Sequence, residues 1–251
     1  MSTQDYRARI YARYATRFQD AKAQFDHSAS ARWGRAYRHY FREWLPLNRE
    51  ARIVDLACGG GKLVHFFKSH GYINTIGVDI SPEQVALARQ VPAQIELANA
   101  LEFLEANPNY FDLITALDLV EHFHKPEVLR FLDGCAAALR PGGRLILQTP
   151  NADSPWGTTH RYNDFTHEAA FTEYSIGQIL GLAGFEDINV YGNVTHINSS
   201  WKRALFNIAA KIIAAMTKLI LAYIYMPGSR QPGIMTTFLM ARGKNINKER
   251  A

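Results

Sequence analysis

The chain of 251 residues is long enough for one large α/β domain, with or without additions, and 47% of its residues are apolar. Two cysteines exclude a disulfide-rich scaffold and do not suggest a zinc site. The net charge of +5 is uneven, with +6 over residues 1–52, −9 over 53–200 and +8 over 201–251, so the basic ends favour an anionic partner such as a membrane surface, nucleic acid or a phosphate-bearing substrate.

The first fifty residues carry two helical patterns. From Tyr6 to Phe18 an apolar or aromatic residue recurs every four positions, and a second helix begins near Ser28 or Ser30, either of which can cap it. The second helix interleaves aromatic residues with arginines and ends at Pro46. That pattern occurs in nucleic-acid-binding proteins, but such a face more often packs on a core, and we expect packing. No apolar run follows the polar, basic start, so we expect no signal peptide and a cytoplasmic location.

A short strand, a glycine turn and a helix come next. Residues 53–56 predict a buried strand, glycines occupy 59–61, and a helical pattern starts at Leu63. A doubly wound sheet opens its first cofactor crevice in this way. The dinucleotide fingerprint G-x-G-x-x-G would need a glycine at Val64, so the sequence does not match it.

The arrangement Asp55-x-Ala57-x-Gly59-x-Gly61 resembles the first motif of class I S-adenosylmethionine-dependent methyltransferases, with Ala57 in place of its first glycine. We expect the Ala57 methyl group only to narrow the turn. The resemblance extends from residue 51 to about 191. It implies an α/β fold with a Rossmann-like, seven-stranded doubly wound sheet and S-adenosyl-L-methionine as the cofactor. It also implies that residues 1–50 form an N-terminal helical cap, part of it a lid, on a methyltransferase domain that covers 51–251.

The remaining strands are predicted from apolar runs that end in polar loops. They cover residues 74–79, 94–97, 111–116, 144–148, 185–191 and 233–242, and the last is expected to be antiparallel. An amphipathic helix is predicted over 125–139, and a turn over 140–143 follows it.

Two polar residues at strand ends are the main cofactor candidates. Asp79 ends the second strand, where a carboxylate accepts hydrogen bonds from two ribose hydroxyls. Because Ser81 is expected to cap the next helix, Asp79 is expected to be free for the ligand. The family usually has an acidic residue at Asn99 that binds the adenine amino group, and an amide oxygen can accept the same bond. The resemblance implies these cofactor-binding residues: Asp55, Ala57, Cys58, Gly59, Gly61, Asp79, Ile80, Asn99, Ala100 and Leu117.

Two polar loops supply the catalytic candidates. One follows the fourth strand and contains His122, and the other spans 160–168 after the fifth strand. A hydroxyl acceptor needs a general base, for which we expect His167 or His122, with His160 behind them. Asp164 or Glu168 is expected to orient the histidine, and Arg161 to hold an acidic or phosphate group of the acceptor. In the alternative interpretation, His167 and Asp164 only fix the loop.

A metal site and a nucleic-acid substrate are both disfavoured. His122 and His124 beside Glu121 are too few ligands at that spacing, so we predict no metal. The Pro-Pro-aromatic signature of nucleic-acid amino-group methyltransferases does not follow the fourth strand, so we predict no nucleic-acid substrate.

An insertion separates the last two strands, over about 192–232. Its apolar run 204–226 is long enough to suggest a membrane span, but Lys211 and Lys218 on one face argue against it. We expect a helix that contacts the membrane surface, with Lys202, Arg203 and Arg230 beside it. A helix buried in a homodimer or on the core is the alternative.

The acceptor is inferred from a narrower resemblance. The 160–168 loop, Trp44-Leu45-Pro46, Glu121-His122 and Pro150-Asn151 resemble segments of methyltransferases found with bacterial surface-polysaccharide (O-antigen type) enzymes. This resemblance implies an O-methyltransferase for a sugar in a surface or lipid-linked glycan, at the inner face of the membrane. The alternatives are a prenylated quinone-type phenol, a soluble sugar nucleotide, and a membrane-associated scaffold that binds cofactor without turnover.

Overall fold

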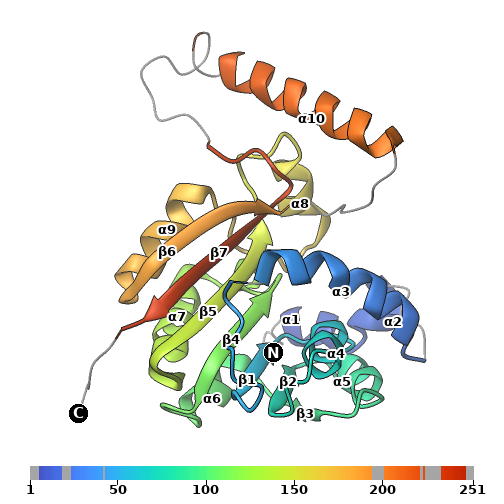
Figure 1. The fold of residues 1–251 in the computed structure, drawn as a ribbon, viewed down its shortest axis with the longest axis vertical. Helices are drawn as coiled ribbons and strands as arrows, with labels where there is room; N and C mark the ends of the chain where they lie inside the picture. The colour runs from blue at the N-terminus through green and yellow to red at the C-terminus, as the bar shows by residue number, and fades with distance from the viewer. Residues whose placement is uncertain are drawn as a thin grey trace, which may run out of the picture.

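A single twisted sheet organises the computed structural model, which describes residues 6–18, 24–41, 43–193, 201–220, 223 and 233–246. Within these ranges seven strands lie in the order β3-β2-β1-β4-β5-β7-β6 (Figure 1). They are β1 (Ile53–Leu56), β2 (Thr75–Asp79), β3 (Gln94–Leu97), β4 (Phe111–Leu117), β5 (Leu139–Pro150), β6 (Phe185–Asn193) and β7 (Phe238–Asn245). β7 is antiparallel to β5 and β6, and the other paired strands are parallel. The predicted fold class is confirmed.

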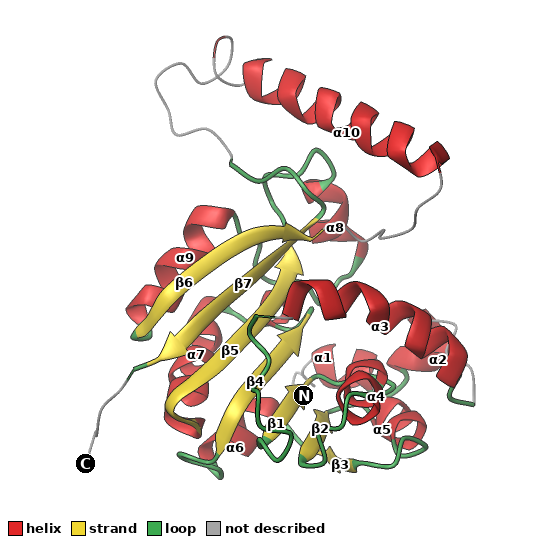
Figure 2. Cartoon of the chain, in the orientation of Figure 1, coloured by secondary structure: helices red, strands yellow, loops and turns green. Residues whose placement is uncertain are grey.

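Helices cover both faces of the sheet (Figure 2). Successive strand residues point to opposite faces. The helices of the domain body are α3 (His27–Phe41), α4 (Lys62–Ser69), α5 (Pro82–Ala88), α6 (Ala100–Glu105), α7 (Lys125–Ala138), α8 (Gly157–Asn163) and α9 (Glu173–Leu182), with a 3-10 turn at Val120–His122. Because the strand side chains alternate, Val54 and Ile114 pack in one core with α6, α7 and α9, while Ile53 and Leu113 pack in another with α3 and α4.

The N-terminal helices differ in detail from the prediction. The stripe from Tyr6 forms two short helices, α1 (Tyr6–Tyr11) and α2 (Tyr14–Phe18), in place of one. α3 begins at His27, before either predicted cap, because the Asp26 carboxylate accepts the Ala29 N–H at 2.8 Å.

The aromatic face of α3 packs on the domain, as expected. Tyr37, Tyr40 and Phe41 are buried with residues of α4 and of the sheet. Gly34 allows this approach, since a Cβ there would lie 3.0 Å from the Phe66 ring. The arginines around this face therefore border a packed helix.

The fifth strand is longer than predicted and contains the expected turn. β5 runs over Leu139–Pro150, and its register against β4 shifts between Phe111 and Leu113. Gly142 has φ of +80°, so the predicted turn at 140–143 forms an irregularity inside the strand.

The insertion between β6 and β7 contains α10 (Trp201–Ile220), which stands away from the domain body in Figure 1. Within the described ranges, none of the helices combines the length and apolar character that crossing a membrane requires. Residues 221–222 and 224–232, including Arg230, and the side chains of Lys202, Arg203 and Asn207 lie outside the described part of the chain.

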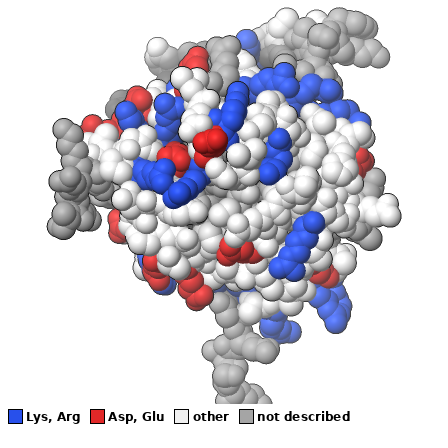
Figure 3. All heavy atoms as spheres, turned by 60° about the horizontal axis from the view of Figure 1, so that its bottom comes forward, with Lys and Arg blue, Asp and Glu red and all other residues white. Residues whose placement is uncertain are grey.

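Charged side chains of both signs share the surface. On the face drawn in Figure 3, Lys and Arg lie among Asp and Glu. This face therefore does not carry charge of a single sign.

Candidate active site

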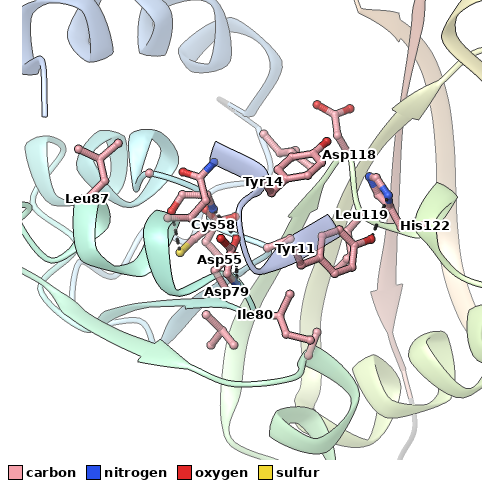
Figure 4. Close-up of a pocket in the computed structure, with 18 of the residues that line it drawn as sticks. Tyr11, Tyr14, Asp55, Cys58, Asp79, Ile80, Leu87, Asp118, Leu119 and His122 are labelled. Atoms are coloured by element: carbon pink, nitrogen blue, oxygen red, sulfur yellow. Dashed lines mark hydrogen bonds between the residues drawn. The ribbon is translucent and has the colours of Figure 1, made fainter. Parts of the chain in front are cut away.

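A cavity of about 1000 Å³ lies at the carboxyl ends of β1, β2 and β4, against α1, α2 and α3 (Figure 4). This edge is where an open α/β sheet binds its ligand. Nine of the ten predicted cofactor residues line the cavity: Asp55, Ala57, Cys58, Gly59, Asp79, Ile80, Asn99, Ala100 and Leu117. The tenth, Gly61, lies behind the lining, where a Cβ would come within 3.1 Å of Ala88. A glycine at position 61 therefore allows α4 to pack closely against α5.

Ala57 adopts a conformation that L-residues disfavour. Its φ is +53°, in the left-handed region, as is that of Gly59 at +51°. A non-glycine residue there costs about 1–2 kcal/mol. The expectation that the methyl group only narrows the turn was wrong, because the cost comes from the backbone conformation.

Asp79 holds the glycine turn as well as facing the cavity. Its carboxylate accepts the Gly59 N–H and the Ser81 N–H, each at 2.8 Å. Ser81 occupies the N-cap position of α5 with Pro82 after it, as expected, but its side chain makes no cap bond and its buried Oγ has no hydrogen-bond partner. The expectation that Asp79 is free for the ligand was wrong, because Asp79 accepts the two main-chain N–H groups. A carboxylate has about four lone-pair sites, so Asp79 retains capacity for ribose hydroxyls.

Asn99 also has a structural role that the prediction lacked. Its Oδ1 accepts the Leu101 N–H at 2.9 Å and so caps α6. This is the oxygen that was expected to accept a bond from the adenine amino group, so a nucleoside would share it with the helix.

Buried acids make the cavity complementary to a cation. Burial raises the pKa of Asp55 to about 7, although the Thr115 hydroxyl donates to it at 2.8 Å. Burial also raises the pKa of Asp118 to about 6, and Gln148 donates to this carboxylate at 3.1 Å. A sulfonium nucleoside carries a positive charge at sulfur and on its amino group. The acidic lining and the unpaired Ser81 Oγ therefore fit S-adenosylmethionine.

His122 and His167 meet at the other end of the cavity. Their ring centroids are 4.7 Å apart, and both residues line the cavity. His167 Nδ1 lies 2.7 Å from the main-chain oxygen of His160. A carbonyl only accepts, so Nδ1 carries the hydrogen and neutral His167 has its lone pair on Nε2. This arrangement gives a histidine that can take a proton.

His122 is neutral near pH 7 and is held by a bridge to Asp164. Burial and the adjacent His167 lower the pKa of His122 to about 4. The Thr166 hydroxyl lies 2.8 Å from His122 Nδ1 and donates to Asp164 at 2.6 Å. Asp164 thus reaches the histidine through Thr166 and does not itself line the cavity.

Like Asp164, the predicted catalytic residues His160 and Arg161 lie outside the cavity lining. The His160 ring packs on Phe238, with centroids 5.3 Å apart. The Arg161 guanidinium donates to the main-chain oxygens of His167 and Glu168. The geometry therefore assigns Arg161 to fixing the loop that carries His167, in place of holding an acceptor group.

A helical cap over residues 1–50 was expected, but none of its residues was predicted to be part of the site. Arg7, Tyr11 and Tyr14 line the cavity from these helices. The Tyr11 hydroxyl is 3.3 Å from His122 Nδ1, and Tyr14 donates to Asp164. The spacing that includes Tyr14 was interpreted only as a helical pattern, and Tyr11 lies outside that spacing.

One cluster of side chains can accept a metal ion. Among the described residues, Glu121, His122 and His167 offer ligand atoms that all lie within 4.8 Å of one another. Glu121 is buried, its Oε1 has no hydrogen-bond partner, and burial raises its pKa well above the usual range. His124, which the sequence placed beside this pair, lies instead 3.3 Å from Glu168.

Relatives in sequence cover about half of the chain. An enzyme named ubiquinone biosynthesis O-methyltransferase from Coxiella burnetii is 31% identical over 145 residues, which is 49% of this chain and 60% of that protein. The enzyme of the same name from Xylella fastidiosa is 31% identical over 155 residues, or 52% of this chain and 60% of that one. The match thus spans well under two thirds of these relatives.

Solved structures match almost the whole chain. A SAM-dependent methyltransferase from Archaeoglobus fulgidus aligns with a TM-score of 0.62 and 20% identity, covering 96% of this chain and 100% of that one. Phosphoethanolamine N-methyltransferase 2 from Haemonchus contortus, in complex with S-adenosyl-L-methionine, aligns with a TM-score of 0.60 and 15% identity, covering 93% of this chain and 59% of that one. At these identities the likeness concerns the fold.

The family model of the methyltransferase domain matches residues 25–190, from the loop before α3 into β6, and so includes most of the cavity. This match covers more than half of the chain. The chain therefore belongs to the methyltransferase domain family, and its fold is that of the SAM-dependent methyltransferases with which it aligns.

Proposed function

We propose that this methyltransferase acts on a hydroxyl oxygen, and that the hydroxyl belongs to a phenolic ring of the quinone type. The observation that carries the proposal is His167, whose Nδ1–H donates to the His160 carbonyl and leaves Nε2 as a proton acceptor beside neutral His122. A neutral amine attacks through its nitrogen lone pair without first losing a proton, whereas a hydroxyl is a weak nucleophile until its proton is removed and so benefits from a base in this position.

Residues at different places along the cavity have different roles. The bound cofactor supplies an activated methyl group on a sulfonium. Asp79 and the glycine turn hold the nucleoside, and the acids Asp55 and Asp118 favour its positive charge. His167 accepts the hydroxyl proton, while Thr166 and Asp164 keep His122 in place next to it. Alignment of the acceptor oxygen with the methyl group then supplies much of the acceleration.

Acidity favours a phenol over a sugar as the acceptor. A phenol loses its proton with a pKa of about 10, the ordinary value of a tyrosine side chain. The pKa of an alkyl hydroxyl is closer to that of water, which is about 15.7, so a histidine assists its deprotonation much less. The relatives named for ubiquinone biosynthesis support the same choice, and no comparison supports the glycan expected from the sequence.

The aromatic residues near His167 also suit a ring carried on an apolar tail. Trp156, Tyr162 and Phe165 are exposed in the segment that leads to His167. An apolar tail of the acceptor can lie against such side chains, which lose unfavourable contact with water on binding.

The test is product formation from purified chain and S-adenosyl-L-methionine. A catechol, a phenol with a short prenyl tail and a soluble sugar nucleotide serve as acceptors, and mass spectrometry locates the added methyl group. We expect methylation of a phenolic oxygen, with the prenylated phenol giving the higher kcat/KM. Methylation of the sugar alone contradicts the proposal.

Variants assign the base. His167→Ala should lower kcat about 10²–10⁴-fold, the usual contribution of a general base. His39→Ala is the matched control, because His39 is exposed on α3 and does not line the cavity. If the His167 variant keeps full activity at every pH, His167 is not the general base.

A further inference from the structure

Helix α10 presents a broad apolar face to the solvent. Its large aliphatic side chains are exposed by 41–59%. At about 100° per residue they form one continuous arc of about 140°. These residues are Leu205, Ile208, Ile212, Ile213, Met216, Leu219 and Ile220. A cluster of this kind on a protein surface indicates a contact with another apolar surface.

The opposite side of α10 is less exposed than the apolar side. Ala214, Thr217 and Lys218 lie on that side and are partly buried. The Lys218 ammonium donates to the main-chain oxygen of Gly233, just before β7. The polar side of the helix therefore makes this contact, and the apolar arc stays exposed to solvent.

Either a second copy of the chain or a lipid surface could cover this face, and the charge of the helix distinguishes the two. α10 contains Lys202, Arg203, Lys211 and Lys218 and no acidic residue. A second copy would bring the same basic helix against it, so the charges would repel. An anionic lipid surface offers complementary charge. A helix is about 10 Å wide, so lysines on α10 would lie within about one Debye length, about 10 Å, of a lipid surface that touches the apolar arc.

We propose that α10 lies in the plane of an anionic membrane surface, with its apolar arc inserted at the headgroup level. A basic amphipathic helix with one wide apolar face binds membranes in this way. The helix is not a span, since its polar side is committed to the domain through Lys218. This assignment concerns location and does not depend on the acceptor.

The test is co-sedimentation of the full chain with vesicles of equal parts phosphatidylcholine and phosphatidylglycerol. The double variant Ile212→Glu with Met216→Glu places two acids in the arc, and we expect binding to fall at least about tenfold. The control Leu47→Glu with Leu182→Glu makes the same chemical change at two exposed apolar residues outside α10. The control should bind as the wild type does, and vesicles of phosphatidylcholine alone or high salt should weaken wild-type binding.

Three outcomes overturn the proposal. They are absence of wild-type binding to the anionic vesicles, equal loss in both double variants, and a wild-type dimer in solution that only the arc variant dissociates. Circular dichroism and the melting temperature establish that each variant is folded. Because the readout is lipid binding, it stands apart from the outcome of the methylation assay.

Discussion

Replacing Asp79 with asparagine tests whether one carboxylate serves both the fold and the cofactor. The side chain is 9% exposed and accepts two main-chain N–H groups at 2.8 Å, from Gly59 and Ser81. Asn keeps one acceptor oxygen and presents an NH₂ group to the other donor. We therefore expect Asp79→Asn to lower stability without cofactor as well as cofactor affinity.

The magnitudes follow from the bonds lost. One hydrogen bond to a charged group contributes about 1.5–3 kcal/mol. Burial raises the pKa of Asp79, so part of that gain is offset by desolvation and the lower half of the range applies. A loss of about 2 kcal/mol lowers Tm by roughly 4–8 °C in a chain of this size. Loss of one charged bond to a ribose hydroxyl weakens cofactor binding about tenfold to hundredfold.

Calorimetry with S-adenosylhomocysteine and thermal melts without ligand measure the two effects separately. Asp133→Asn is the matched control, because Asp133 is exposed on α7 and its replacement changes net charge by the same amount. An Asp79 variant with weaker cofactor binding but unchanged Tm refutes the reasoning. That result means that the two main-chain bonds contribute nothing and that Asp79 is free after all.

Three further variants test the site. Ala57→Gly should raise Tm by roughly 1–4 °C, because removing about 1–2 kcal/mol of left-handed strain exceeds the added chain entropy, and a lower Tm contradicts this. Since the pKa of folded Asp55 is about 7 against an ordinary 3.8, the folded state binds its proton more tightly, so Tm should fall as pH rises from about 4 to about 7. Asp55→Asn should flatten that fall, and an unchanged slope in melts across this range excludes Asp55 as its source. Thr166→Val breaks the bridge between Asp164 and His122 and should lower kcat about tenfold and shift its pH profile, with the acceptor KM unchanged. Unchanged kcat and pH profile indicate that the bridge only fixes the loop.

The cofactor half of the site was predictable because its signals are local. The strand, the glycine turn and a carboxylate one strand further are close in sequence, and their spacing is imposed by the βαβ geometry. The roles of Ser81 and Asp79 were exchanged in the prediction, since either side chain can serve the backbone there. Packing alone determined that Asp79 accepts the two amide bonds.

The acceptor half was only partly predictable, because it forms from distant segments. His122 and His167 were both candidates, yet their contact depends on how the loop after β5 folds over the end of β4. Tyr11 of α1 reaches His122 from 111 positions earlier in the chain, and a helical pattern in the sequence does not show which distant segment a side chain will face.

The sequence by itself determined the sheet, the cofactor class and the presence of an apolar helix in the last insertion, since hydrophobic periodicity and glycine spacing report on neighbours along the chain. Only the tertiary structure decided that Arg161 fixes a loop, that His167 has its lone pair on Nε2, and that the apolar arc of α10 faces outward. Each of these depends on which main-chain oxygen or which surface lies opposite a side chain, and that relation is created by folding.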